Sequence, residues 1–150
     1  MNGAELTTAI RSIIKGYDKY LDDAGDSCGL NRTERDSLLF LYNNPQYNTA
    51  RDIVEYRMIP KANVSQAVDS LIAKGYLERE ACTSDRRRVH LALTASGQSA
   101  AARLKDCQLR FGEALFDGLS REERDILEKT NGIIMKNIKN ILNAKEQSNG

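Results

Sequence analysis

Residues 64–97 of the chain, VSQAVDSLIAKGYLEREACTSDRRRVHLALTASG, decide the fold. The first part of this stretch predicts a helix, because Val64, Val68 and Leu71 recur at three- and four-residue steps. Gly75 suits the left-handed position just past the end of that helix. The remainder predicts two short strands joined by a basic turn, so the expected order is helix, strand, turn, strand.

The two strands are expected at residues 76–80 and 88–93, with a hairpin tip at residues 82–87. Alternation in the second strand places three apolar side chains on one face, those of Val89, Leu91 and Leu93. The other face carries Arg88, His90 and Ala92.

Upstream of this stretch, apolar periodicity predicts helices at about residues 4–22, 31–43, 49–57 and 61–74. Asn31 and Thr49 are N-cap residues for the second and third helices, and Pro60 marks the start of the fourth. The buried faces of the last three helices are expected to include Leu38, Leu41, Tyr42, Ile53, Val54, Met58, Val64, Ala67, Val68, Leu71 and Ile72. Two helices joined by a tight turn and followed by a hairpin have the outline of a winged helix-turn-helix.

Downstream, Thr94 caps a long fifth helix, and the pattern Ser120-x-x-Glu123 is a capping box that opens a last helix. The first and last helices each carry one apolar stripe that needs a partner. In the last helix the stripe comprises Ile126, Leu127, Ile133, Ile134, Ile138, Ile141 and Leu142. We therefore expect the ends of the chain to form a homodimer interface.

Composition describes a globular chain of 150 residues with 41% hydrophobic and 29% charged residues. No apolar run approaches the roughly 18 residues that span a bilayer, and the N-terminus has no signal-peptide pattern, so a cytoplasmic protein without a membrane partner is expected. Three cysteines without a CxxC pair argue against disulfides or zinc, and no metal or cofactor is expected. A net charge of +1 permits a nucleic-acid partner without demanding one.

The outward face of the fourth helix carries hydrogen-bonding side chains where a solvated helix usually carries Glu and Lys. Asn and Gln pair bidentately with adenine, and Ser suits a base or a phosphate. The candidate base-reading residues are Asn63, Ser65, Gln66 and Ser70, and Lys61 is a candidate phosphate contact. An ordinary polar face is the competing interpretation.

Three consecutive arginines, Arg86, Arg87 and Arg88, stand at the hairpin tip and its exit. A narrow minor groove attracts an inserted arginine, and a hairpin tip is thin enough to enter it. Asp85 is placed to orient the guanidinium of Arg87, which leaves Arg86 and Arg88 for phosphates. A solvated basic turn is the alternative.

The chain resembles the MarR (multiple antibiotic resistance regulator) family of winged helix-turn-helix transcription factors. Asp85-x-Arg87, Leu93-Thr94 and Gly97 match the wing pattern D-x-R-x(5)-L-T-x-x-G of that family. The fourth helix and its exit through Lys74-Gly75-Tyr76 match the recognition helix. The resemblance implies a mainly α fold with a small β wing (α+β), in a single domain over residues 1–150. A DNA-binding lobe would occupy about residues 30–97, and dimerisation helices about residues 4–22 and 98–143.

The resemblance also implies function. The expected protein is a homodimeric regulator that binds double-stranded DNA at a pseudo-palindromic operator, with half-sites roughly 10 bp apart. A repressor relieved by a small aromatic ligand is expected. The residues expected to line the ligand pocket are Tyr17, Tyr20, Phe40, Tyr42 and Tyr56.

Three other functions compete with this one. The low net charge suits a winged-helix protein-interaction or dimerisation module without DNA binding. A thiol-based redox sensor is a second alternative, with Cys82 near Arg79 and Arg86 in the best setting for activation. An enzyme is the third and finds no support, because no catalytic motif occurs and the single histidine, His90, has an expected surface role.

Overall fold

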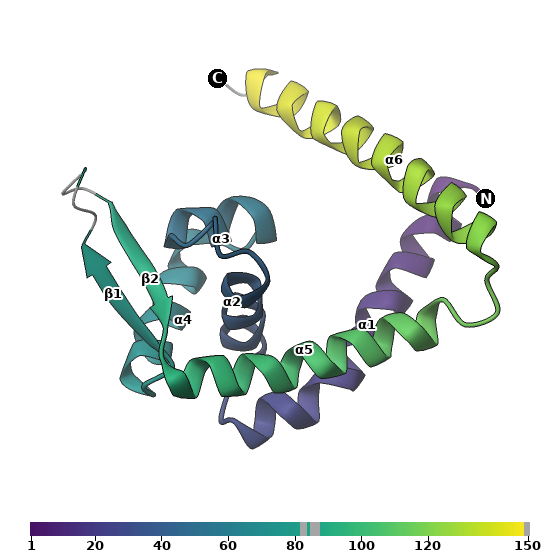
Figure 1. Cartoon of the computed structure of the whole chain (residues 1–150). Helices are drawn as coiled ribbons and strands as arrows, with labels where there is room; N and C mark the ends of the chain where they lie inside the picture. The colour runs from purple at the N-terminus through teal and green to yellow at the C-terminus, as the bar shows by residue number, and fades with distance from the viewer. Residues whose placement is uncertain (82–83, 85–87, 149–150) are drawn as a thin grey trace. The chain divides into compact units, whose positions relative to one another are not determined.

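A computed structural model describes residues 1–81, 84 and 88–148 of the chain, with side chains as far as residue 146. The elements in chain order are α1 (Gly3–Ser27), α2 (Arg32–Asn43), α3 (Ala50–Arg57), α4 (Lys61–Ala73), β1 (Leu77–Ala81), β2 (Val89–Leu93), α5 (Ala95–Leu115) and α6 (Arg121–Ser148) (Figure 1). The chain divides into two compact units, residues 1–112 and residues 113–150. The expected mainly helical fold with a two-stranded wing is confirmed.

Local capping explains where the helices of the first unit begin. The side chain of Asn31 accepts a hydrogen bond from the backbone N–H of Glu34 at 2.9 Å, as predicted for the start of α2. Thr49 and Asp52 form a reciprocal capping box at the start of α3. Pro60 precedes α4 without a side-chain cap, since its fixed φ already suits a helix start.

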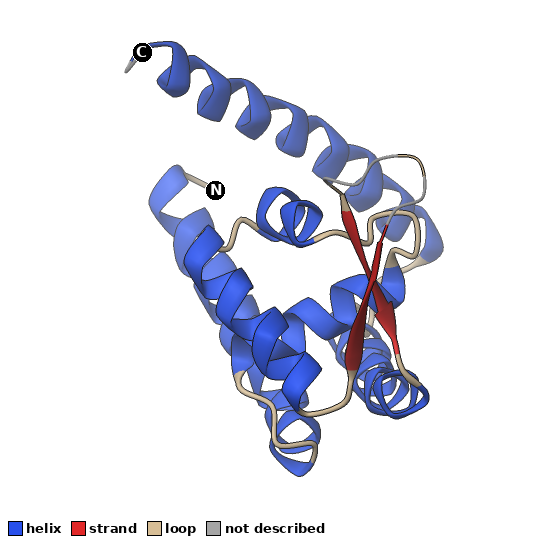
Figure 2. Ribbon diagram, turned by 90° about the vertical axis from the view of Figure 1, so that its left-hand side faces the viewer, coloured by secondary structure: helices blue, strands red, loops and turns tan. Residues whose placement is uncertain are grey.

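The wing is an antiparallel pair in which Leu77 faces Leu93 and Ala81 faces Val89 (Figure 2). Each strand starts one residue later than predicted. Tyr76 is not part of β1, because its N–H donates to Leu71 O at 2.9 Å and its carbonyl accepts from Thr94 N at 3.1 Å. Gly75, with φ of +78°, makes this turn out of α4 as predicted.

Burial in β2 fades toward its outer end. Leu91 is buried and Leu93 is half-buried, but Val89 is 43% exposed. Val89 is the first residue of β2 and lines an open pocket beside the start of α3. The prediction that Met58 lies on a buried face is wrong. Met58 adopts the left-handed conformation that ends α3 and is 64% exposed.

The core of the first unit is formed by apolar side chains from α1, α2, α3, α4, the wing and α5. Val64, Val68 and Leu71 of α4 are at most 3% exposed, which confirms the stripe that predicted this helix. The fully buried positions also include Leu21, Leu38, Ile53 and Leu104. The core therefore fixes which face of α4 is left outside.

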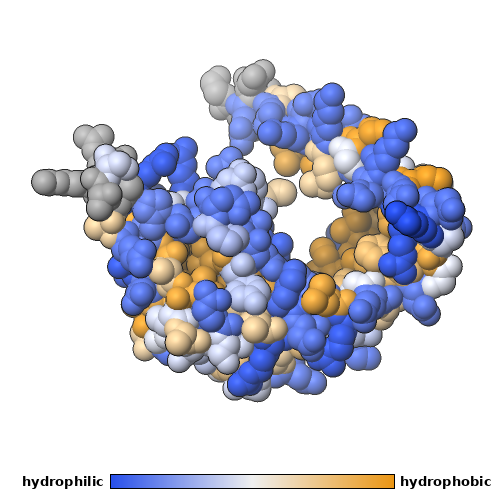
Figure 3. Space-filling view, viewed as in Figure 1, coloured by the Kyte–Doolittle hydropathy of each residue, from blue (hydrophilic) through white to orange (hydrophobic). Residues whose placement is uncertain are grey.

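The second unit contains α6, whose capping box at Ser120 and Glu123 forms as predicted. Apolar side chains reach the surface along α6 (Figure 3). They are Ile126, Leu127, Ile133, Ile134, Met135, Ile138, Ile141 and Leu142, all at least 40% exposed in the single chain. Over the described residues, no helix combines the length and the apolar character needed to cross a membrane.

Candidate nucleic-acid interface

The outward face of α4 begins with exposed side chains. Lys61, Asn63, Ser65 and Gln66 are all exposed, whereas Val64 and Ala67 between and beside them are buried. Four of the five base or phosphate contacts predicted on this helix therefore lie on one accessible surface at its N-terminal half.

Ser70, the fifth, differs from the others. It is half-buried, and its hydroxyl donates a hydrogen bond to Glu34 Oε1 at 3.0 Å. Glu34 is 4% exposed and also receives Lys74 Nζ at 2.5 Å and Asn31 Nδ2 at 2.9 Å. Lys74 Nζ additionally donates to Gly29 O at 2.6 Å. These contacts fasten the C-terminal half of α4 to α2, so Ser70 holds the helix in place.

Charge on the outward face of α4 is balanced by the wing. Asp69 is the one carboxylate in the sequence of α4, and its Oδ1 lies 2.6 Å from Arg79 Nη2 of β1. Both side chains are exposed, so the pair contributes little to stability. Its effect is local, because it offsets a negative charge that would face a polyanion.

Of the predicted wing residues, Asp85, Arg86 and Arg87 lie outside the described residues. Arg88 is described and is exposed just before β2. His90, expected on the outer surface, is half-buried, and its Nδ1 lies 2.5 Å from Asn48 Oδ1. A second bond, from Leu91 N to Asn48 O at 2.7 Å, ties the segment before α3 to β2.

The aromatic residues predicted to share a ligand pocket form two separate groups. Tyr17 and Tyr20 of α1 meet Phe111 edge-on, with ring centroids 5.4 and 5.6 Å apart. Phe40 stacks with Tyr56 at 6.1 Å, and Tyr56 contacts Tyr47 at 4.5 Å. Tyr42 is half-buried against the core.

Tyr17 lines an open pocket of about 570 Å³ between α1, α2, the end of α3 and α5. The other four predicted aromatic residues are not part of its lining, which comprises Ile13, Ile14, Asp18, Arg32, Thr33, Asp36, Arg57, Ile59, Gln108 and Phe111 as well. Burial raises the pKa of Tyr17, and a hydrogen bond from Gln108 Nε2 at 3.1 Å partly offsets that rise.

Arg35, next to this pocket, is a buried cation that the sequence did not reveal. It is 1% exposed, and its guanidinium contacts Asp18 and Asp22 of α1 at 2.7 Å each and Asp36 at 3.2 Å. Burial alone lowers the pKa of Arg35, but Asp36 and Asp18 raise it above its ordinary value. The network joins α1 to α2, and breaking such a buried pair typically costs about 3–5 kcal/mol.

The cysteines differ in accessibility. Cys107 is 7% exposed, and Arg110 Nη2 lies 3.3 Å from its sulfur. Cys28 is half-buried, and its carbonyl accepts a hydrogen bond from the hydroxyl of Tyr76 at 2.8 Å. Cys82, the thiol that the sequence favoured as a sensor, lies outside the described residues.

Known proteins match the segment that carries this interface. A model of the MarR family matches residues 29–88, from the turn before α2 to the residue before β2. Residues 29–88 are thus similar to the MarR family. The MarR-family segment thus contains α2, α3, the whole exposed face of α4 and β1, together with Arg88.

Similarity extends beyond the MarR-family segment. YwhA of Bacillus subtilis (strain 168), an uncharacterized HTH-type transcriptional regulator, is 26% identical over 119 residues, which cover 79% of this chain and 84% of that protein. A MarR family transcriptional regulator from Listeria monocytogenes, complexed with a 26mer DNA, has a TM-score of 0.79 at 17% identity and covers 88% of this chain and 87% of its own. The S. aureus MepR–DNA complex has a TM-score of 0.75 at 20% identity, covering 91% and 96%. Both structures establish the fold.

Proposed function

We propose that this protein is a homodimeric, sequence-specific DNA-binding regulator of transcription from the MarR family. It acts in the cytoplasm as a repressor that a small ligand relieves, and it has no enzymatic activity. The observation that carries the proposal is the exposed start of α4, where Lys61, Asn63, Ser65 and Gln66 share one surface. Amide and hydroxyl groups there supply base-edge hydrogen bonds, and Lys61 supplies a charge for a phosphate.

The wing supplies the second part of the proposed interface. Asp85 orients Arg87 for the minor groove, and Arg86 and Arg88 take phosphates on either side. Support comes from Arg88, which is exposed beside β2 and free of ion pairs with other described residues. The Listeria monocytogenes and S. aureus relatives, which have the same fold, are complexed with DNA.

Dimerisation through the chain ends is supported by two apolar surfaces. The stripe of α6 is exposed along its length, and Ile10, Ile13 and Ile14 of α1 are each at least 42% exposed. Contiguous apolar surface of this extent marks a protein interface. A two-fold dimer would present two copies of α4 to two half-sites about one helical turn apart.

Relief by a ligand is assigned to the pocket beside Tyr17. Its walls include Asp18 of the proposed dimerisation helix α1 and Arg57 at the end of α3. An occupant would therefore touch both the proposed dimer interface and the helix-turn-helix. Binding that favours one arrangement of these elements would change DNA affinity by the difference in ligand affinity between the two states.

The test is selection of binding sites from a random pool of double-stranded DNA with the purified full chain. We expect enrichment of a palindrome whose half-sites are about 10 bp apart. Failure to enrich any sequence, with a folded protein, would contradict sequence-specific binding.

A protein-interaction module is the second candidate function. It is favoured by the net charge of +1 and by the apolar stripe of α6. The two functions differ in salt dependence, because each phosphate contact contributes a slope of about −0.9 in log affinity against log salt. Weak binding to all DNA with a flat salt dependence would favour the interaction module.

A further inference from the structure

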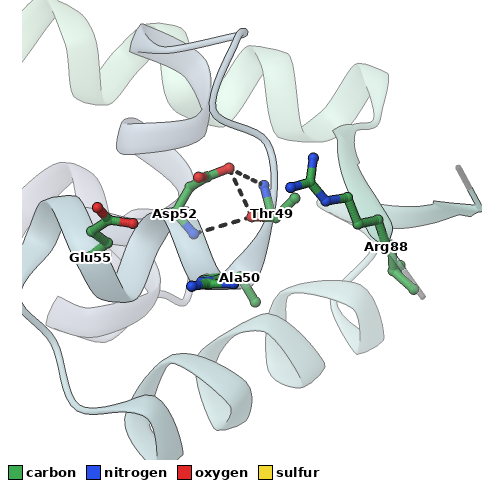
Figure 4. A pocket seen from close by; sticks show the side chains of 7 residues that line it. Thr49, Ala50, Asp52, Glu55 and Arg88 are labelled. Atoms are coloured by element: carbon green, nitrogen blue, oxygen red, sulfur yellow. Dashed lines mark hydrogen bonds between the residues drawn. The ribbon is translucent and has the colours of Figure 1, made fainter. Parts of the chain in front are cut away.

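Two arginines outside α4 converge on one polar pocket beside the wing. The pocket lies between the start of α3 and the start of β2, and Arg51 and Arg88 both line it. Figure 4 shows the pocket with Arg88 labelled. Arg51 comes from the first turn of α3, and Arg88 comes 37 residues later in the chain. The two hydrogen bonds of Asn48 to β2 hold these segments side by side.

Both guanidinium groups are available for a ligand. Arg51 and Arg88 are exposed, and neither forms an ion pair with another described residue. Five other arginines of the first unit are engaged by carboxylates, namely Arg32, Arg35, Arg57, Arg79 and Arg110, whereas Arg11 and Arg103 form no ion pair with another described residue. The arginine pair, Arg51 and Arg88, therefore differs from these five in carrying no carboxylate partner among the described residues.

The carboxylates in the pocket have different roles. Asp52 is engaged in the cap of α3, since its Oδ2 accepts from Thr49 N at 3.1 Å and from Thr49 Oγ1 at 2.8 Å. Glu55, one turn further along α3, is exposed (Figure 4). Glu55, one turn after Arg51 on the same face of α3, thus places a negative charge in the pocket beside the arginine pair.

We propose that the arginine pair is a binding site for one backbone phosphate of the DNA, with Arg51 as a DNA contact outside α4 and the wing. Two planar guanidinium groups suit a phosphodiester, which offers two charged oxygens to donors approaching from two sides. The pocket adjoins the start of β2, which directly follows Arg88, so DNA held by α4 and the wing would pass it. This inference rests on the proposed function and adds a sequence-independent contact that sets the register of the duplex.

The test measures DNA affinity over a series of about 50 to 200 mM salt with the full-length dimer and the selected operator. Arg51→Gln and Arg88→Gln should each weaken binding about threefold to tenfold, and the double variant should lower the salt slope by about one unit in all, because the two side chains share one phosphate. Because both side chains contact one phosphate, the double variant should lose less than the product of the two single losses. Glu55→Gln should strengthen binding about twofold to threefold.

Arg103→Gln is the matched control, because Arg103 is an exposed arginine of α5 that lines a different pocket with Ala24 and Cys107. This control should bind DNA like the parent. Parent-like binding by Arg51→Gln, or a double-variant loss equal to the product of the single losses, would overturn the proposal that the two arginines bind one phosphate. If the parent itself binds no DNA, the proposed function fails; if the parent binds and Arg51→Gln binds equally well, the phosphate site alone fails.

A free anion such as inorganic phosphate could bind the same two guanidinium groups as a backbone phosphate. A separate measurement distinguishes the two ligands. Inorganic phosphate added to the DNA-free protein should leave the melting temperatures of the parent and of Arg51→Gln alike. Stabilisation of the parent by phosphate that Arg51→Gln abolishes would assign the pocket to a free anion and overturn the DNA assignment.

Discussion

Replacement of Gly97 by alanine should destabilise the base of the wing. Gly97 lies in the first turn of α5, and a Cβ atom built on it would stand 2.0 Å from Tyr76 O and 3.0 Å from Tyr76 C. Side-chain Cβ atoms do not approach other atoms closer than 3.0 Å, so the carbonyl must retreat by at least 1.0 Å. That carbonyl accepts the hydrogen bond from Thr94 N that closes the wing against α5.

The magnitude follows from three contributions to the free energy of unfolding. Overpacking against rigid backbone costs about 1–3 kcal/mol or more, and weakening the Thr94 hydrogen bond costs about 1 kcal/mol. Alanine in a helix returns up to about 1 kcal/mol relative to glycine. The net expectation for Gly97→Ala is a loss of about 2–3 kcal/mol, which lowers the melting temperature of a chain this long by about 5–10 °C.

Gly112→Ala is the matched control in the same helix, because nothing lies within 4 Å of a Cβ atom at Gly112. It should be neutral or stabilising by up to about 1 kcal/mol. Urea denaturation followed by circular dichroism at one protein concentration measures both variants, since folding coupled to dimerisation depends on concentration. The steric explanation is refuted if Gly97→Ala unfolds at the urea concentration of the parent, or if Gly112→Ala loses as much.

Three further predictions concern the recognition helix, the dimer and pH. Gln66→Ala should weaken operator binding by about 1–3 kcal/mol and leave binding to random DNA nearly unchanged in a competition assay; equal losses on both would mean that Gln66 reads no base. Glutamate at both Ile134 and Ile138, exposed positions on α6, should yield monomers in sedimentation, whereas a stable dimer would place the interface elsewhere. The pKa of Tyr17 is raised by burial, so the stability it contributes is complete below about pH 10 and is lost as the pH rises through its higher folded-state value. Tyr17→Phe should flatten the fall of unfolding free energy above pH 10, and an unchanged profile would contradict that origin.

Local signals in the sequence were sufficient for the helices and the hairpin. Asn31, Thr49 and Gly75 have roles that depend on residues within a few positions, so their spacing predicted helix boundaries correctly. The exposed start of α4 could also be predicted from the sequence, because the buried stripe of Val64, Val68 and Leu71 fixes the opposite face.

The buried charges could not be found in this way. Glu34 and Arg35 are adjacent in a helix, a pattern typical of a solvated face, yet both are at most 4% exposed. Lys74, the partner of Glu34 just past the end of α4, is 40 residues away, and the partners of Arg35 on α1 are 13 and 17 residues away. The sequence predicted Ser70 as a DNA contact because its bond to Glu34 forms only when α2 and α4 pack together, and local spacing does not show that packing. The aromatic residues were grouped by type, and the fold separates them.

The junction between wing and helix has a mechanical consequence. Thr94 stands alone between β2 and α5, and its hydroxyl donates to Gly75 O at 2.6 Å while accepting from Gly97 N at 3.0 Å. Because this single bonded residue is the whole connection between β2 and α5, we expect the hairpin and α5 to move together as one rigid unit. Strands of five residues extend about 17 Å, and a 5° turn of α5 therefore moves their far ends by about 1.5 Å. That displacement is nearly half the axial step between base pairs, about 3.4 Å, so in the proposed complex a small rotation of α5 would shift the wing relative to the groove.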